Sequence, residues 1–151
     1  MISLAALLWG MGARAQEPFL KPAEGAVVRY RAEVTFGQVR MSGIMAVRAE
    51  PDRVAGSLMN EFGIKAFDFE CRDGRARVEN AAGPLGRRPV RRTIEADMAR
   101  LFCGAGRRRT YRYGEENGAA VLDNLRRGIR YELRPLESAG GENIDRYDVA
   151  E

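Results

Sequence analysis

Two carboxylates, Asp68 and Glu70, stand two residues apart within the segment Phe67-Asp68-Phe69-Glu70. Residues at this spacing point to the same face of a β-strand, so the two form a carboxylate pair of the kind that serves acid–base chemistry. The alternative is a solvated outer face, opposite an apolar face that carries Phe67 and Phe69. We favour the solvated face, because no second catalytic signal accompanies the pair.

The sequence lacks the usual residues of catalytic and metal sites. It contains no histidine, the commonest general base and metal ligand. Neither a G-x-S-x-G motif nor a glycine-rich phosphate loop is present. Two cysteines without histidine do not favour a zinc site. We therefore expect no enzyme activity, no cofactor and no metal.

Cys71 and Cys103 are the only cysteines of the chain. In an oxidising compartment they can pair, and closing a loop of this length contributes about 3–4 kcal/mol to stability in the chain-entropy model. The alternative is two buried, unreacted thiols, because the sequence does not show whether the Cα atoms lie close enough for a disulfide.

The first fifteen residues differ in composition from the rest of the chain. A short apolar stretch, residues 2–11, is followed by Ala13-Arg14-Ala15. An apolar run that ends in A-x-A is typical of a secretory signal peptide and its cleavage site. We predict a signal peptide over 1–15 and one mature domain over 16–151, in the periplasm or cell envelope. The alternative is an N-terminal helix that belongs to the core.

Alternation of apolar and polar residues predicts a mainly β protein. Val28, Tyr30, Ala32 and Val34, for example, alternate with charged and polar residues, which is the period of a half-buried strand. The predicted strands span residues 28–36, 39–47, 53–60, 64–72, 75–79, 111–113, 119–122, 129–133 and 145–149. Closely spaced turn signals such as Asp73-Gly74 favour an antiparallel, meandering sheet or a partly closed barrel.

One helix interrupts the strands. After Pro89, which suits a first helical turn, apolar residues recur at spacings of three and four over 90–102. Arg91 and Glu95 can pair on its outer face, and Gly104 predicts its end.

The net charge of +4 and the pI of about 9.4 come almost entirely from arginine. Arginines at 107, 108, 109 and 112 stand beside Tyr111 and Tyr113, a mixture that can stack nucleic-acid bases. The alternatives are a strand with arginines outward and tyrosines inward, or contact with anionic lipid. Because an exported protein seldom meets nucleic acid, we expect no nucleic-acid partner.

The segment Met59 to Phe69, with its N-E-F-G-x-K-x-F-D-F pattern, resembles uncharacterised envelope members of the bacterial lipoprotein-localisation (LolA/LolB-like) family. The strand that contains Ser42-Gly43-Ile44 and the helix over 90–102 add to the resemblance. It implies a curved antiparallel sheet that forms an unclosed barrel, with a helix on the concave side and a cavity for acyl chains. The outer-membrane receptor of that family is a lipoprotein, whereas this chain has Gln16 rather than cysteine after the predicted cleavage site.

A ligand cavity between sheet and helix would be lined by apolar residues of both, and methionines suit a pocket that adapts to flexible chains. The candidates are Met41, Met45, Leu58, Phe67, Phe69, Ile94, Met98 and Leu101. We expect a lipid- or lipoprotein-binding module of the envelope, with a role in lipoprotein transport to the outer membrane and with peripheral contact to the membrane. Two alternatives stay open: the same residues fill an ordinary core, and the domain is a non-catalytic structural or interaction protein with an envelope partner.

Overall fold

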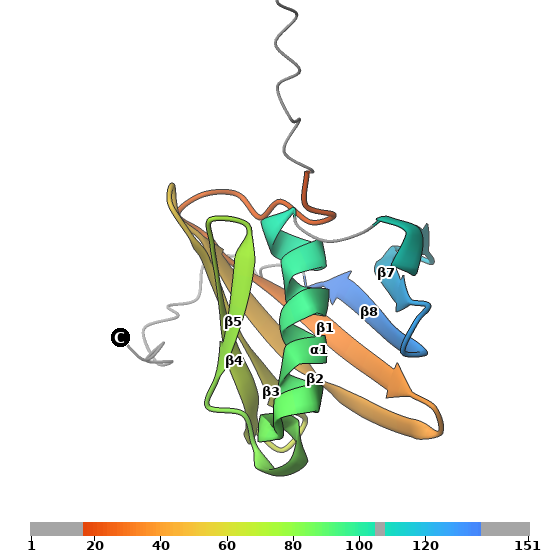
Figure 1. Cartoon of the computed structure of the whole chain (residues 1–151). Coiled ribbons are helices and arrows are strands. Elements are labelled where there is room, and N and C mark those ends of the chain that lie inside the picture. The colour runs from red at the N-terminus through yellow and green to blue at the C-terminus, as the bar shows by residue number, and fades with distance from the viewer. Residues whose placement is uncertain (1–16, 105–107, 137–151) are drawn as a thin grey trace, which may run out of the picture.

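A computed structural model describes residues 17–104 and 108–136 of the chain (Figure 1). Eight strands form one antiparallel sheet in the order β5-β4-β3-β2-β1-β8-β7-β6. The strands are β1 (Val27–Phe36), β2 (Val39–Ala49), β3 (Val54–Asn60), β4 (Lys65–Arg72), β5 (Arg75–Glu79), β6 (Tyr111–Glu116), β7 (Ala119–Asn124) and β8 (Ile129–Pro135). Eight of the nine predicted strands are confirmed. The ninth, over 145–149, and the predicted signal peptide lie outside the described residues.

Local sequence explains how the strands connect. The turns at Asp73-Gly74 and Asn117-Gly118 have positive φ at both residues, from 50° to 77°, as tight hairpin turns require. Gly43 lets β2 approach β3 closely, because a Cβ atom there would lie 1.9 Å from the carbonyl oxygen of Met59. The register between β3 and β4 shifts between Leu58 and Met59. Gly43 therefore makes its close approach to Met59 at the point where the pairing of β3 with β4 is irregular.

One helix crosses the sheet. α1 (Arg88–Met98) follows the short 3₁₀ turn η1 (Gly83–Gly86), has Pro89 in its first turn, and continues as the π-helical turn η2 (Ala99–Cys103). Gly104 ends it with φ of 75°, which is the left-handed conformation typical of a helix end. The prediction of a helix over 90–102 is confirmed in position, although its last turn is wider than an α-helix. A second 3₁₀ turn, η3 (Arg108–Thr110), precedes β6.

Contacts of α1 show that the sheet is curved. The helix packs against β5 at one edge of the sheet, while Asp97 on α1 accepts a hydrogen bond from Tyr111 on β6 at the other edge. Eight strands laid flat would span about 34 Å, whereas a helix is only about 10 Å wide. The sheet must therefore curl around the helix, as Figure 1 shows. This is the predicted mainly β architecture, an unclosed sheet with one helix.

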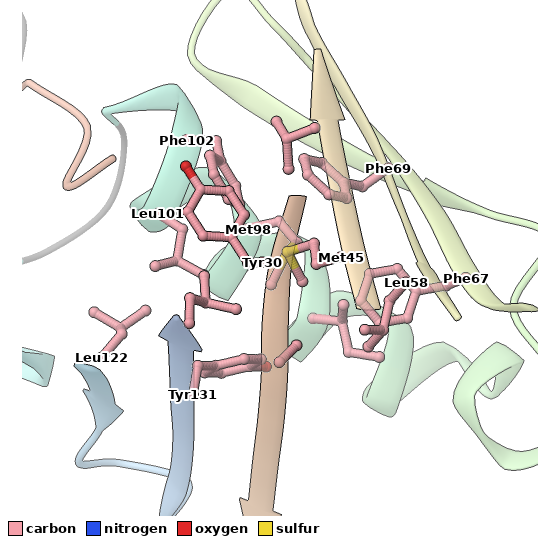
Figure 2. Packing of buried hydrophobic residues seen from close by; sticks show 14 of the residues in the cluster. Tyr30, Met45, Leu58, Phe67, Phe69, Met98, Leu101, Phe102, Leu122 and Tyr131 are labelled. Carbon is pink, nitrogen blue, oxygen red and sulfur yellow. The ribbon is translucent and has the colours of Figure 1, made fainter. Parts of the chain in front are cut away.

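The core lies between α1 and the inner face of the sheet. Alternate residues of each strand point into it, and the helix contributes Ile94, Met98, Leu101 and Phe102. The rings of Phe69 on β4 and Phe102 on η2 stack with centroids 5.3 Å apart. Figure 2 shows these side chains gathered between helix and strands.

Candidate functional site

The eight residues predicted to line a cavity come together in the structure. Seven of them are at most 6% exposed and belong to one cluster: Met45, Leu58, Phe67, Phe69, Ile94, Met98 and Leu101. Met41 is partly buried and packs against the cluster. The methionines Met45 and Met98, from sheet and helix, are both fully buried members of this cluster, and both are labelled in Figure 2.

The cluster is closed in this structure. One surface depression, of about 160 Å³, is lined on the outer face of the sheet by residues of β1, β7 and β8. Another, of about 210 Å³, is lined by the turns after β2 and β4 together with Phe102 and Cys103. None of the eight residues lines either depression. The side chains of the cluster therefore fill the space between α1 and the sheet at these positions.

The two ends of α1 are held very differently. No residue from Arg87 to Arg92 is buried, and Val90 is 37% exposed. Burial begins at Ile94 and becomes continuous from Asp97 to Phe102. The N-terminal half of the helix consequently lies over the sheet with little apolar contact of its own.

Asp97 anchors the other half. Its carboxylate is completely buried. Oδ1 accepts hydrogen bonds from the Tyr111 hydroxyl at 2.8 Å and from Asn124 Nδ2 at 2.6 Å, and Oδ2 accepts one from the Tyr131 hydroxyl at 2.5 Å. The three donors come from β6, β7 and β8, so one side chain ties the helix to three strands. We call Asp97, Tyr111, Asn124 and Tyr131 the Asp97 cluster.

Burial dominates the electrostatics of this cluster. It raises the pKa of Asp97 above its usual value, although the hydrogen bonds from its three donors and the positive charge of Arg127 act in the opposite direction. Burial, followed by the charge of Asp97, raises the pKa of Tyr131 and of Tyr111. Both tyrosines therefore stay protonated and act as donors across the physiological pH range.

Arg100 is the second charged residue with no exposed surface. Its guanidinium lies over the ring of Phe19, 4.2 Å from the centroid, and that ring stacks on Tyr113 at 4.4 Å. The amide of Leu20 also donates a hydrogen bond to the carbonyl oxygen of Leu101 at 2.9 Å. The segment before β1 therefore packs against the C-terminal end of the helix and is hydrogen-bonded to it.

A disulfide joins the same end of the helix to β4, which lies near the opposite edge of the sheet from β6. Cys103 on η2 is bonded to Cys71 on β4, with Cα atoms 5.5 Å apart. The Asp97 cluster and this disulfide lie within seven residues of each other along the helix. Together they hold its C-terminal end against β4 and against β6 to β8.

Compared with known proteins, the chain matches no protein-family model and no curated protein sequence. Among the described residues, no helix is both long and apolar enough to cross a membrane.

Asp68 and Glu70 lie on the outer face of β4, each in its own set of contacts. Asp68 accepts hydrogen bonds from Ser57 Oγ at 2.5 Å, Asn80 Nδ2 at 2.8 Å and Lys65 Nζ at 3.0 Å. Burial alone would raise the pKa of Asp68, but these three donors outweigh it and lower the pKa. An oxygen of Glu70 lies 3.1 Å from Arg72. The pair thus forms part of a network of outer-face polar contacts.

The two tyrosines beside the basic segment are not oriented as the stacking of nucleic-acid bases would require. Tyr111 points inward to Asp97, and Tyr113 stacks on Phe19. Arg112 lies outward and pairs with Asp123 at 3.3 Å. Arg107 lies outside the described residues.

Sequence reasoning missed Asp97 and Arg100. Both lie on the apolar face of the helix: Asp97 follows Ile94 by three residues and precedes Leu101 by four. Charged residues are rare at such buried positions, and those that occur there are paired with other groups. The spacing of the polar residues along the stripe, rather than that of the apolar ones, would have revealed them.

Proposed function

We propose that this protein is a periplasmic module of the cell envelope that binds acyl chains of lipids or lipoproteins between α1 and the concave face of the sheet. A role in lipoprotein transport to the outer membrane fits such binding. The single observation that carries the proposal is the one-sided attachment of α1. Its end from Asp97 to Cys103 is anchored, whereas its first half covers the apolar layer without buried residues of its own.

In this proposal α1 acts as a lid that opens at its Arg88 end. Movement about the anchored end separates Ile94 from the inner face of the sheet, and an acyl chain replaces the lost contacts. Each Å² of apolar surface that the chain buries contributes about 25 cal/mol, before the cost of ordering the chain. Met45 and Met98 suit this exchange because their side chains are unbranched and adaptable. The resemblance of Met59 to Phe69 to lipoprotein-localisation proteins supports the same conclusion.

The first test is native mass spectrometry of the chain from Gln16, purified from a bacterial periplasm, with lipid extraction of the same sample. A co-purifying phospholipid, fatty acid or acylated peptide is the expected result, and it identifies the ligand class. Titration of the delipidated protein with a fluorescent fatty acid measures the affinity. A bare mass together with no titratable binding contradicts the proposal.

A pair of methionine variants shows where the chain binds. Met98→Ala removes a fully buried side chain from the cluster, so it leaves an apolar space and should increase fatty-acid binding. Met59→Ala is the matched control, since Met59 lies on the outer face of β3, whose inner face carries Leu58. Binding that changes equally in both variants would place the ligand elsewhere.

The closed core favours a second candidate, a non-catalytic structural or interaction domain of the envelope. The cluster is filled by seven residues that are at most 6% exposed, as an ordinary core would be. This candidate predicts a stable complex with an envelope protein and no lipid in the purified sample. The mass measurement separates the two candidates directly.

A further inference from the structure

A depression on the outer face of the sheet, the face that points away from α1, is lined by charged side chains of both signs. It has a volume of about 160 Å³ and lies over β1, β8 and β7, which are neighbours in the sheet (Figure 1). Its lining residues are Arg31 and Glu33 of β1, Glu132 and Arg134 of β8, and Ala119 of β7. This depression is therefore separate from the apolar cluster under the helix.

The strand register places like charges directly opposite each other in this depression. Arg31 pairs with Arg134 across β1 and β8, and Glu33 pairs with Glu132 in the next row of the same face. Two residues along a strand span about 7 Å, so a positive end and a negative end lie about that far apart. Like charges directly opposite each other destabilise a sheet. A local conflict of this kind is typical of a functional site.

Neighbouring arginines neutralise the negative end. An oxygen of Glu33 lies 3.5 Å from Arg40, and an oxygen of Glu132 lies 3.1 Å from Arg130. The acids on the outer face of β6 and β7, which both contact Arg130 as well, are Glu116 and Asp123. The four carboxylates around the depression are therefore all paired.

The two arginines of the positive end are not neutralised in this way. Within residues 17–104 and 108–136, no carboxylate lies within 4.0 Å of Arg31 or Arg134. The guanidinium of Arg134 donates a hydrogen bond to the backbone carbonyl oxygen of Asn117 instead. A Cβ atom at Gly118 would lie 3.4 Å from Nη1 of Arg134, so the β6–β7 turn lies against this guanidinium. A neutral acceptor fixes its position, and its charge and further N–H groups stay available to a ligand.

We propose that the depression binds an aminoalkyl phosphate, a phosphate and a primary ammonium joined by a short linker, of which phosphoethanolamine is the simplest example. The phosphate lies between Arg31 and Arg134, because two guanidiniums match its charge of about −2 and donate paired hydrogen bonds to its oxygens. The ammonium lies beside Glu33 and Glu132, whose oxygens accept its hydrogen bonds. The arginines alone would accept any oxyanion, whereas the adjacent glutamates favour one that also carries a cation.

Isothermal titration calorimetry of the chain from Gln16 tests the site. We expect phosphoethanolamine to bind with a Kd of about 1 mM or tighter. Inorganic phosphate should bind about threefold more weakly or worse, because it lacks the ammonium. Arg31→Gln/Arg134→Gln should weaken phosphoethanolamine about tenfold or more, since it removes the charged donors.

A glutamate variant tests the negative end through the sign of its effect. Glu33→Gln/Glu132→Gln removes two charges that attract the ammonium and repel the phosphate. It should therefore weaken phosphoethanolamine about threefold or more and should strengthen inorganic phosphate. A plain oxyanion site would instead gain affinity for both compounds.

The matched control is Arg72→Gln/Arg75→Gln. These arginines also lie directly opposite each other, on β4 and β5, but Arg72 pairs with Glu70 at 3.1 Å. The control should keep the wild-type Kd within about twofold, because charges that far from the depression are screened at physiological salt. Urea denaturation checks folding: Arg31→Gln/Arg134→Gln should be at least as stable as the wild type, because it removes a like-charge pair.

Glycerophosphoethanolamine distinguishes the two sources of this chemistry, because it carries the phosphodiester of a lipid head group without acyl chains. Binding of phosphoethanolamine at least as tightly assigns a soluble monoester, and tighter binding of glycerophosphoethanolamine assigns a lipid head group. The inference is overturned if neither compound binds with a Kd of about 1 mM, if the control loses as much affinity as the arginine variant, or if the glutamate variant binds both compounds more tightly. Fatty-acid titration probes the opposite face of the sheet, so failure of this site and failure of the acyl-chain proposal are distinguishable.

Discussion

The first half of α1 and its C-terminal end meet the rest of the protein in different ways. From Arg88 to Arg92 no residue of the helix is buried. From Asp97 to Cys103 it is held by three side-chain hydrogen bonds to three strands, by a disulfide to a fourth strand, and by backbone contacts with the segment before β1. A single continuous helix therefore combines a part with few stabilising contacts and a part with many.

This difference allows one element to serve both as a scaffold and as the lid that we propose. Local opening requires little free energy where apolar contacts are few, and close to the global unfolding free energy where they are dense. Polar anchors suit the fixed end because hydrogen bonds and a disulfide are directional and hold a defined geometry. The exposed end can then move without unfolding the sheet.

The largest expected effect comes from breaking the polar anchor. Asp97→Ala leaves Tyr111, Tyr131 and Asn124 with buried donors that lack their acceptor, so we expect a loss of about 3–5 kcal/mol in the free energy of unfolding. Asp97→Asn keeps one acceptor oxygen and should lose clearly less. Urea denaturation of both variants measures the difference. Equally small losses in both variants would mean that the hydrogen bonds of Asp97 contribute little.

Removing the disulfide should have the next largest effect. The double variant Cys71→Ala/Cys103→Ala opens a cross-link between residues 32 positions apart, which corresponds to about 3–4 kcal/mol in the chain-entropy model. Urea denaturation with and without reductant is the measurement. Reductant should bring the wild type to the stability of the variant and leave the variant unchanged. A variant as stable as the oxidised wild type would show that the polar anchor alone fixes the helix end.

Val90 and Ile94 compare the two regions most directly, because they lie one turn apart on the same face of α1. Ile94 is 6% exposed and Val90 37%. We expect Ile94→Ala to cost about 2–4 kcal/mol and Val90→Ala less than about 0.5 kcal/mol. Hydrogen exchange should show the same order, with faster exchange in the helix before residue 94. Similar costs for both substitutions would remove the distinction on which the lid depends.

Sequence periodicity was sufficient for most of the fold. Alternation along β1 and β2 and turn pairs such as Asp73-Gly74 are local signals, so the strands, the turns and the position of the helix follow from neighbouring residues. The candidate cavity residues lie in one cluster, since an inner face is determined by the same alternation. Whether they enclose a space depends on the distance between helix and sheet, which no periodicity contains.

The polar anchor required tertiary information. Asp97 and Tyr131 are 34 residues apart, and nothing in either segment shows that the two side chains meet. Nor does the pattern show that Phe62 stays exposed while Phe67 and Phe69, in the same apolar segment, are buried. That difference arises because the β3–β4 turn places Phe62 beyond the edge of the core.

The smallest effect, and the one that tests electrostatics, is the pH dependence of two aspartates. Burial raises the pKa of Asp97, so the native state binds its proton more tightly than the unfolded chain. The stability that Asp97 contributes is then complete below about pH 3.9, its unfolded value, and decreases as pH rises through the folded pKa. Asp68 has a lowered pKa, because its three donors outweigh burial. Its contribution is present above about pH 3.9 and is lost as pH falls through the folded pKa.

The two aspartates should therefore give curves of opposite slope. The measurement is the free energy of unfolding of the wild type minus that of Asp97→Asn, and of the wild type minus that of Asp68→Asn, from acidic to neutral pH. The first difference should fall with rising pH and the second should rise. Parallel curves would show that the Asp97 carboxylate is hydrated as freely as a surface group, and the anchored end of α1 would then be open to water.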